Sequence, residues 1–462
     1  MENTRELVLD MLMEILEKGA YSHLVIRDVL DKYDYMDSRD KAFVKRVTEG
    51  TLERLIEIDF YLDQFSKVAV PRMKPLIRNL MRMSVYQLLY MDSIPDSAVC
   101  NEAVKLAGKR GYRGLSGFVN GVLRNLARNR KRLLLREEND FPDGNSPVGK
   151  EKYQYLSVKY SMPRWLIELW MVTYGEGITY FILKGLLEPQ PLTLRFRESL
   201  PEKQKRQWLA ALKETDIRAE QHPYLPYAYR ILNGAGIRSL PGYKEGFFAV
   251  QDVSGMLVAE VSGIDRMAGE PLVLDVCASP GGKSMHMAEK LSGRGKVISR
   301  DISEYKVSLM RDNIDRMGYS NIEVQIYDAA ALDEGLVEKA DVVLADLPCS
   351  GLGVIGKKRD IKYRVTETDL RKLEELQRRI LDVVWRYVKP GGIMIYSTCT
   401  INPGENEKMV EWFTENYSFV TEELTPYLPE PLKEEGKNGM LQLFPGHHMA
   451  DGFFIARLRR ME

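Results

Sequence analysis

Cysteine and histidine are scarce in this chain of 462 residues, which has four cysteines and five histidines. No CxxC pair occurs, and so few potential ligands argue against both a disulfide framework and a zinc site. Long apolar runs are also missing, because none approaches the roughly 18 residues that a membrane-spanning helix needs. The opening residues Met1–Glu6 lack the basic and apolar regions of a signal peptide. We therefore expect a cytoplasmic protein with reduced thiols and no membrane partner.

Net charge is absent as well, since 66 basic residues balance 66 acidic ones. The charge is unevenly spread, because no acidic residue lies between Glu102 and Glu137. The basic residues of this interval are Lys105, Lys109, Arg110, Arg113, Arg124, Arg128, Arg130, Lys131, Arg132 and Arg136. Such a stretch can neutralise phosphates, so it favours contact with nucleic acid, although a solvated helix face and a linker would carry the same residues.

The N-terminal part, residues 1–135, has a helical pattern throughout, with apolar residues recurring at three- and four-residue spacing. Strand signals are missing there, so an all-α bundle is predicted. Residues 136–152 are polar and rich in turn-forming residues, which is typical of a linker. A chain of this length is too long for one core, so further domains are expected beyond the linker.

Residues 153–255 alternate helical segments with short strand-like runs, which indicates a small α+β module. Residues 256–462 alternate strand and helix in the manner of a doubly wound α/β sheet. The expected strands are Leu272–Val276, Val297–Arg300, Ile322–Tyr327, Val342–Ala345 and Ile393–Ser397, with late strands at Phe419–Thr421 and Gly452–Leu458. Ligands of such a sheet bind at the carboxyl ends of the strands.

The first strand of the predicted sheet ends at Asp275 and leads into the glycine turn Gly281-Gly282 and Lys283. A glycine pair lets the backbone pass close to a ligand, and the amides at the start of the next helix favour a carboxylate or phosphate. Asp301, 20 residues after Gly281, ends the second strand, where an acidic group can accept hydrogen bonds from ribose hydroxyls. Further acidic residues end the third and fourth strands, namely Asp328 and Asp346.

Two familiar nucleotide motifs are absent, because the chain has neither a GxGxxG turn nor a GxxxxGK[ST] loop. A dinucleotide or a Walker-type phosphate site is therefore disfavoured. An adenosyl cofactor without a polyphosphate, such as S-adenosylmethionine, fits best.

Two cysteines follow the predicted fourth and fifth strands. Cys349 lies in Asp346-Leu-Pro-Cys-Ser-Gly351, and Cys399 lies in Tyr396-Ser-Thr-Cys-Thr400. Because these strands commonly neighbour each other, both thiols can reach one crevice. A buried cysteine is more often a small hydrophobic residue, but the turn-forming neighbours favour a reactive role.

Three segments, Asp275–Lys283, Asp346–Gly351 and Ser397–Thr400, resemble the RNA (cytosine-5) methyltransferases that use S-adenosylmethionine. The N-terminal segments Asn101–Val104 and Gly117–Arg124 are similar to the NusB-type RNA-binding bundle. This fusion resembles the bacterial 16S rRNA methyltransferases of the RsmB (Fmu, Sun) type, over nearly the whole chain. The resemblance implies a Rossmann-like methyltransferase domain, an RRM-like module before it, and 16S rRNA as the partner rather than DNA. Nothing in the sequence demands more than a monomer.

Residue roles also follow from the resemblance. It implies that Cys399 attacks C6 of cytosine, that Cys349 helps to release the covalent intermediate, and that Asp346 and Lys283 lie at the reacting centre. The cofactor-binding residues that it implies are Cys277, Ala278, Ser279, Pro280, Gly281, Gly282, Lys283, Asp301, Asp328 and Asp346. Covalent addition at C6 is physically reasonable, because it makes C5 nucleophilic.

Two alternatives remain open at this stage. A tRNA cytosine-C5 methyltransferase would carry the same motifs, and a NusB-like RNA-binding or antitermination protein could carry an idle methyltransferase domain. The intact pair Cys349 and Cys399 argues against the second. A zinc deaminase is excluded because its HxE and PCxxC ligand set is missing.

Overall fold

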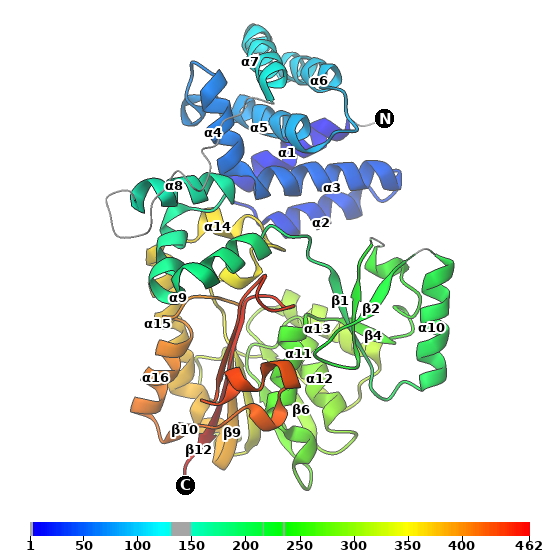
Figure 1. The fold of residues 1–462 in the computed structure, drawn as a ribbon. Helices are drawn as coiled ribbons and strands as arrows, with labels where there is room; N and C mark the ends of the chain where they lie inside the picture. The colour runs from blue at the N-terminus through cyan, green and yellow to red at the C-terminus, as the bar shows by residue number, and fades with distance from the viewer. Residues whose placement is uncertain (1–2, 131–148, 216, 234–235) are drawn as a thin grey trace. The chain divides into compact units, whose positions relative to one another are not determined.

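The computed structural model describes residues 3–130, 149–215, 217–233 and 236–462 (Figure 1). No helix within these ranges is long and apolar enough to cross a membrane. The chain forms two compact units. Unit 1 contains Met1–Leu187 and Ile355–Arg364, and unit 2 contains Glu188–Val354 and Val365–Glu462.

Unit 1 is helical, as predicted. Its helices are α1 (Thr4–Leu16), α2 (Ser22–Lys32), α3 (Ser38–Glu53), α4 (Leu55–Phe65), α5 (Pro75–Tyr90), α6 (Asp96–Lys109), α7 (Ser116–Asn129), α8 (Gly149–Lys159), α9 (Arg164–Gly185) and α14 (Ile361–Arg364). Asn3 caps α1 by accepting hydrogen bonds from the amides of Arg5 and Glu6. Leu9, Val47, Met81 and Leu123, from four different helices, are fully buried in one core, whose burial drives the packing of this bundle.

Acidic side chains neutralise part of the basic stretch in unit 1. The ion pairs are Lys105–Glu102, Lys109–Glu6, Arg110–Asp10 and Arg130–Asp96. Glu6 and Asp10 belong to α1, so the fold brings acidic groups to a segment that has none of its own. Lys131, Arg132 and Arg136 lie outside the described residues. Fewer basic side chains therefore stay available for phosphates than the sequence suggested.

The α+β module begins later than the predicted residue 153. Helices α8 and α9 belong to unit 1, with Leu166, Ile167 and Trp170 fully buried. The backbone amide of Ile56 in α4 also donates to the Ser161 hydroxyl at 3.0 Å. These contacts explain why α8 and α9 belong to unit 1 and not to the α+β module, because an apolar helix packs against the core that can bury its side chains. Most of the predicted linker, residues 136–152, lies outside the described residues.

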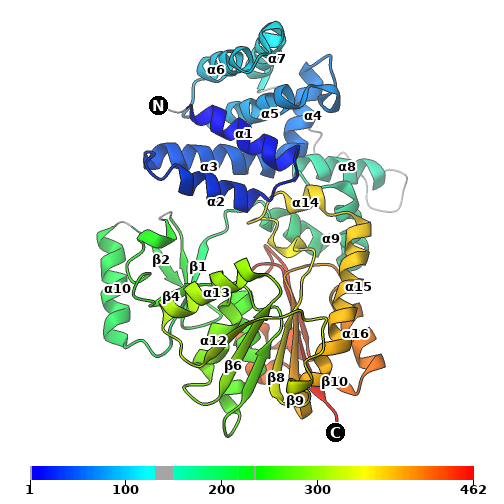
Figure 2. The same cartoon turned by 180° about the vertical axis from the view of Figure 1, so that it is seen from behind.

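The smaller sheet of unit 2 is antiparallel, with strand order β2-β3-β1-β4. Its elements are β1 (Leu192–Phe196), α10 (Glu202–Glu214), β2 (Ala219–Gln221), β3 (Ala228–Ile231) and β4 (Phe248–Val250). Leu194, Phe196 and Phe248 pack against Trp208 of α10, which covers the outer face of this sheet (Figures 1 and 2). Side chains alternate along a strand, so Thr193 and Arg195 of β1 point to the opposite face.

The larger sheet has strand order β10-β12-β9-β8-β5-β6-β7, and β11 pairs with β12. The strands are β5 (Leu272–Asp275), β6 (Lys296–Asp301), β7 (Ile322–Ile326), β8 (Ala340–Asp346), β9 (Val388–Thr398), β10 (Phe419–Thr421), β11 (Met440–Leu443) and β12 (Phe453–Arg460). Strands β5 to β9 are parallel, whereas β12 is antiparallel to β9. The doubly wound fold is therefore confirmed.

Helices cover both faces of the larger sheet. Helices α11 (Val253–Ser262), α12 (Gly282–Lys290) and α13 (Glu304–Met317) lie on one face, and α15 (Glu367–Val384) and α16 (Glu407–Asn416) lie on the other. Strand β5 lies between β6 and β8 in the sheet. After β5 the chain adds β6 and β7 on one side of it and then crosses to add β8 on the other side, so the direction of strand addition reverses between β5 and β8. A crevice at the carboxyl ends of these strands is the expected ligand position in such a sheet. The predicted boundary at 255 falls inside α11.

Candidate active site

A cavity of about 200 Å³ lies at the carboxyl ends of β5 and β8 in unit 2. Its lining includes Asp275, Ala278, Ser279, Pro280, Gly282, Lys283, Asp346 and Cys399 among the residues singled out in the sequence, together with Gln251, Asp252, Asp451 and Phe453. The fold thus brings three separate sequence motifs to one place.

Asp346 and Lys283 form an ion pair in this cavity. The Lys283 Nζ atom lies 2.7 Å from Asp346 Oδ2, while the hydroxyl of Ser397 donates to Asp346 Oδ1 at 2.8 Å. Burial alone would lower the pKa of Lys283, but the charges of Asp346 and Asp275 hold that pKa above its ordinary value. The lysine therefore stays cationic at neutral pH, and the carboxylate is fixed from both sides.

The two cysteines meet beside this ion pair. Cys349 Sγ and Cys399 Sγ are 3.2 Å apart, and the backbone amide of Cys399 donates to Cys349 Sγ at 3.3 Å. The hydrogen bond with Cys399, together with burial, raises the pKa of the Cys349 thiol well above its ordinary value. Cys349 therefore keeps its proton and can donate it toward the sulfur of Cys399.

Glu405 holds the turn that carries Cys349. This carboxylate is fully buried and accepts hydrogen bonds from the backbone amide and the hydroxyl of Ser350, and from the side chains of Gln377 and Asn402. Burial raises the pKa of Glu405, although these hydrogen bonds oppose the rise. Four donors on one buried acceptor fix the Cys349 turn against the start of α16.

The turn between β5 and α12 presents polar atoms to the cavity. Gly281 has φ +96°, a left-handed conformation that a side chain would strain. Asp275 Oδ2 accepts from the Ser284 hydroxyl at 2.6 Å, while Asp275 Oδ1 is buried without a partner among the described residues. Burial raises the pKa of Asp275 to about 7.

Gln251 presents a second polar atom without a partner. Its Oε1 accepts from Arg195 Nε at 2.8 Å, and because an arginine can only donate, the amide Nε2 must face the other way. Nε2 is buried without a partner within the described residues, and Gln251 lines the cavity. Arg195 is itself fully buried and forms an ion pair with Glu289. The cavity therefore offers an oriented hydrogen-bond donor.

Five sequence-derived candidates do not line this cavity, namely Cys277, Gly281, Asp301, Asp328 and Cys349. Asp301 ends β6, next to β5, and its carboxylate accepts from the Ser303 amide at 3.2 Å. Asp328 lies just beyond β7 and accepts from the Ala330 amide. Burial raises the pKa of Cys277, so this thiol stays protonated at neutral pH. Asp301 and Asp328 thus lie at the strand ends on the β7 side of the cavity.

Sequence reasoning did not assign roles to Ser397, Gln251, Glu405 and Ile302. Ser397 belongs to the motif that contains Cys399, and Gln251 lies outside the three motifs. Glu405 lies in the polar turn Asn402-Pro-Gly-Glu-Asn406, which begins three residues after Cys399. A polar turn so close to this cysteine is a sequence signal from which Glu405 could have been predicted. Ile302 follows Asp301 and is 64% exposed, an unusual position for isoleucine at a strand end.

Comparison with known proteins identifies the family of the chain. Residues 266–459 match the 16S rRNA methyltransferase RsmB/F family, and residues 2–128 match the NusB family. The chain is 33% identical to a probable ribosomal RNA small subunit methyltransferase B of Bacillus subtilis (strain 168), over 99% of each chain. It is 32% identical over all of both chains to a probable ribosomal RNA small subunit methyltransferase B of Synechocystis sp. (strain PCC 6803).

A solved structure, that of the protein PH0851, shares the fold with a TM-score of 0.79 and 22% identity, and the match covers 100% of this chain and 99% of that one. The expected adenosyl cofactor agrees with the family, and so does the expected helical RNA-binding domain. The chain therefore belongs to the RsmB/F family of 16S rRNA methyltransferases, carries a NusB-family domain, and is an rRNA methyltransferase that uses S-adenosylmethionine.

Proposed function

We propose that the chain methylates C5 of one cytosine in 16S rRNA, with Cys399 as the covalent nucleophile. The observation that carries this proposal is the meeting of Cys399, Lys283 and Asp346 at one cavity, with the Cys349 sulfur 3.2 Å from that of Cys399. We place the activity in the cytoplasm, in a monomer that acts on rRNA and not on DNA.

The cavity residues fit S-adenosylmethionine. The unpaired atoms Asp275 Oδ1 and Gln251 Nε2 offer a buried acceptor and a buried donor, and the amides at the start of α12 favour a carboxylate. The segment Cys277–Lys283 with Asp346 would hold the methionine end. Asp301 and Asp328 would lie toward the nucleoside, where the exposed Ile302 can cover an adenine ring. When bound, the cofactor supplies an electrophilic methyl group.

Cys399 begins the reaction in this proposal. C5 of cytosine is a weak nucleophile until a thiolate adds to C6, which moves an electron pair to C5. Asp346 accepts a hydrogen bond from the exocyclic amino group of the base, and Lys283 holds Asp346 in place. C5 then takes the methyl group. The target base has to leave its stack to reach the cavity, as in other enzymes that modify a base.

Cys349 acts in the release of the product. While Cys399 is a neighbouring thiolate, it raises the pKa of Cys349 and keeps that proton in place. Once the Cys399 sulfur is bonded to C6 it is uncharged, which removes the largest cause of the raised Cys349 pKa, so Cys349 can lose its own proton to water and then accept the proton from C5. Loss of that proton expels the Cys399 thiolate and restores the aromatic ring.

Transfer of labelled methyl from S-adenosylmethionine to protein-free 16S rRNA tests the proposal. Wild type, Cys399→Ala and Cys349→Ala are compared, with a denaturing gel for protein-RNA adducts. We expect both variants to lose turnover, and an adduct to accumulate only in Cys349→Ala. Normal turnover by Cys399→Ala would overturn the assignment of the nucleophile. Transfer to tRNA but not to 16S rRNA would select the tRNA alternative.

A further inference from the structure

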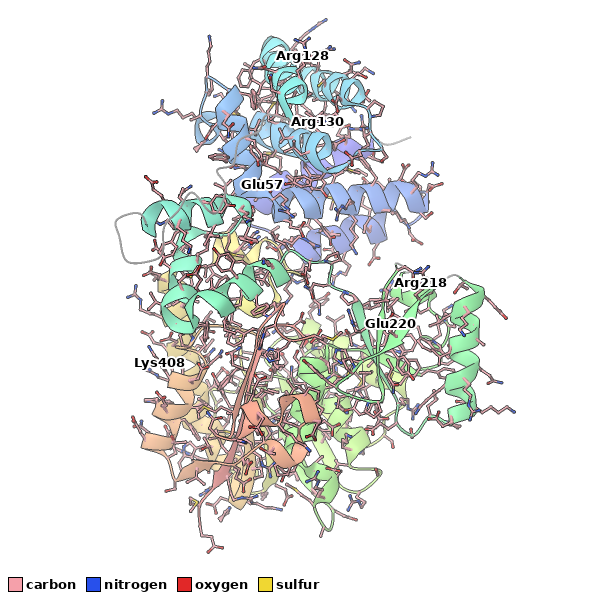
Figure 3. All side chains as sticks on the ribbon, in the orientation of Figure 1. Glu57, Arg128, Arg130, Arg218, Glu220 and Lys408 are labelled. Carbon is pink, nitrogen blue, oxygen red and sulfur yellow. The ribbon has the colours of Figure 1, made fainter. Side chains whose placement is uncertain are left out.

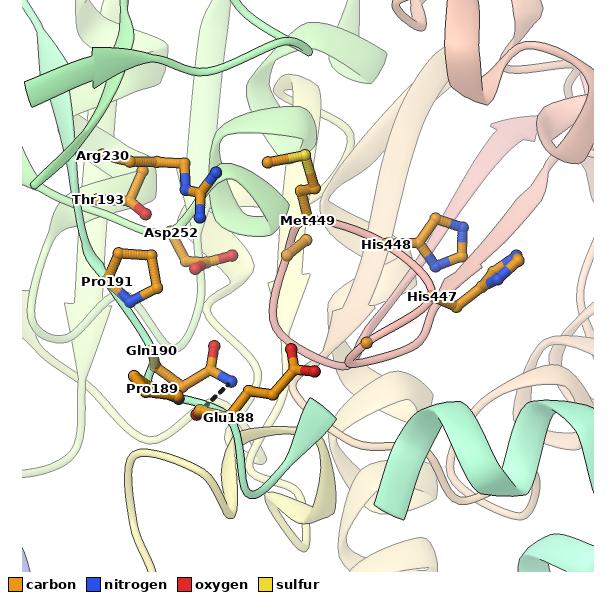
Figure 4. Close-up of a pocket in the computed structure, with 12 residues that line it drawn as sticks. Glu188, Pro189, Gln190, Pro191, Thr193, Arg230, Asp252, His447, His448 and Met449 are labelled. Carbon is orange, nitrogen blue, oxygen red and sulfur yellow. Dashed lines mark hydrogen bonds between the residues drawn. The ribbon is translucent and has the colours of Figure 1, made fainter. Parts of the chain in front are cut away.

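A second cavity, of about 170 Å³, lies next to the active site within unit 2. It is bounded by residues 188–191 before β1, by Thr193 and Arg230 of the small sheet, and by the loop 446–450 between β11 and β12 (Figure 4). Nothing in the proposed reaction uses these residues. The cavity is therefore a candidate for a separate contact with substrate.

Arg230 provides the main donor of this cavity. It pairs with Thr193 across β3 and β1, so both side chains point to the same face of the sheet. Figure 4 shows the guanidinium reaching toward Asp252 and Met449. Within the part of the chain that the structure describes, this half-buried guanidinium has no hydrogen bond or ion pair. Its donors are therefore available to a ligand.

The two cavities have one lining residue in common. Asp252 lines both, and its Oδ1 accepts the backbone amide of Asp451 at 3.1 Å. The loop that forms one side of the second cavity at 446–450 continues into the active-site cavity at Asp451 and Phe453. A group bound in the second cavity would therefore adjoin the active-site cavity at Asp252.

The charges in the second cavity disfavour a bare polyanion. Glu188 and Asp252 are acidic, and Arg230 is the lone lysine or arginine among the lining residues. Met449, which is 46% exposed, and the prolines at 189 and 191 add apolar surface. Donors, acceptors and apolar atoms together suit a nucleobase, which has a polar edge and flat apolar faces.

A metal ion is a poorer occupant. Glu435, His447 and His448 place ligand atoms within 4.8 Å of one another at this loop. However, the Phe444 amide donates to Nδ1 of His448 at 2.9 Å, so the proton of the neutral ring sits on Nε2, which faces Glu435 at 3.1 Å. His448 therefore has no lone pair to offer a metal, and its bond to Glu435 holds the loop instead.

We propose that the second cavity binds the base of the nucleotide next to the target cytosine, with Arg230 as its hydrogen-bond donor. This inference rests on the proposed function. An extruded target base pulls its neighbours out of regular stacking, and single-stranded RNA is read by exactly such contacts to splayed bases. Arg230 would thus help to choose which cytosine is methylated.

A double-mutant cycle between protein and RNA tests the inference. The substrates are a 16S rRNA that wild type methylates and two versions with an abasic site on the 5′ or the 3′ side of the target. We expect one abasic site to lower kcat/KM of wild type roughly tenfold, which is the size of a good base contact. On intact RNA, Arg230→Ala should lower kcat/KM about as much as the abasic site does for wild type. On that abasic RNA, the variant should have a kcat/KM only a little below that of wild type.

The control is Arg218→Ala, an exposed arginine near the start of β2 in the same sheet (Figure 3), which should behave like wild type on every RNA. Binding of S-adenosylmethionine should be unchanged in both variants, which confirms that they are folded. Additive losses from the variant and the abasic site, or no loss from either, would overturn the inference. Failure of wild type to methylate any 16S rRNA would instead overturn the proposed function.

Discussion

The sulfur atoms of Cys349 and Cys399 lie 3.2 Å apart, although 50 positions separate them in the chain. Parallel pairing of β8 with β9 produces this meeting, because Asp346 lies opposite Ser397 at the strand ends. Cys349 follows the end of β8 by three residues, and Cys399 is the residue directly after β9. The pairing of the two strands therefore holds the two thiols together.

This proximity predicts reversible inactivation by a thiol oxidant. Diamide should accept two electrons from the two thiols and leave a Cys349–Cys399 disulfide, so methyl transfer should fall to the background level. A reductant such as dithiothreitol should restore it. Peptide mapping of the oxidised protein would identify the bond. Bound RNA should slow the loss, because the nucleophile is then occupied. A different cysteine pair in the map would contradict the prediction.

Loss of the Asp301 carboxylate should weaken cofactor binding. If Asp301 accepts hydrogen bonds from ribose hydroxyls, Asp301→Ala should raise the Kd for S-adenosylmethionine by roughly tenfold to a hundredfold, the value of hydrogen bonds to a charged group. Calorimetry of wild type and variant would measure the change. Asp312→Ala, an exposed position on α13, serves as the matched control. An unchanged Kd for Asp301→Ala would remove this residue from the cofactor site.

Glu405 should act through the position of Cys349. Glu405→Gln replaces one carboxylate oxygen by an NH2 group, which sets a donor against two of the four donors that Glu405 accepts from, so the Cys349 turn should shift. We expect Glu405→Gln to slow product release roughly tenfold or more and to accumulate the protein-RNA adduct. Accumulation of the adduct would indicate that Glu405 positions Cys349. A general loss of stability would instead lower the amounts of both adduct and product. Exposed Glu411→Gln on α16 should show no adduct.

Lys362 should make the stability of unit 1 depend on pH. Burial lowers the pKa of Lys362 to about 7, while its Nζ donates to the carbonyls of Glu53 and Ser161. Between pH 7 and the ordinary lysine value of 10.5, the unfolded state binds a proton that the folded state does not. The free energy of unfolding should therefore rise with pH across that window.

The test compares the pH dependence of Tm for wild type and Lys362→Met. The variant should lack the rise between pH 7 and 9, whatever its stability at one pH. Lys358→Met, an exposed lysine of the same segment, should keep the wild-type slope. Equal slopes for all three proteins would show that Lys362 is charged in the folded state.

The sequence by itself determined the local elements and the motif positions. Apolar spacing marked the helices of residues 4–129 and the strands that end at Asp275, Asp301 and Asp346, because helical and strand periods leave a direct trace in the order of residues. Strand ends of a parallel sheet meet at one edge, so the convergence of the three motifs could also be predicted.

Only the tertiary structure decided which distant groups meet. The segment Ile355–Arg364 lies between methyltransferase elements in the sequence but belongs to unit 1. Glu6 pairs with Lys109, and Arg195 orients Gln251, across 103 and 56 positions. Such contacts depend on chain topology and on the packing of whole elements, whereas periodicity records only neighbours within a few residues. For that reason the thiol distance, the Glu405 network and the cavity beside Arg230 appear only in the folded chain.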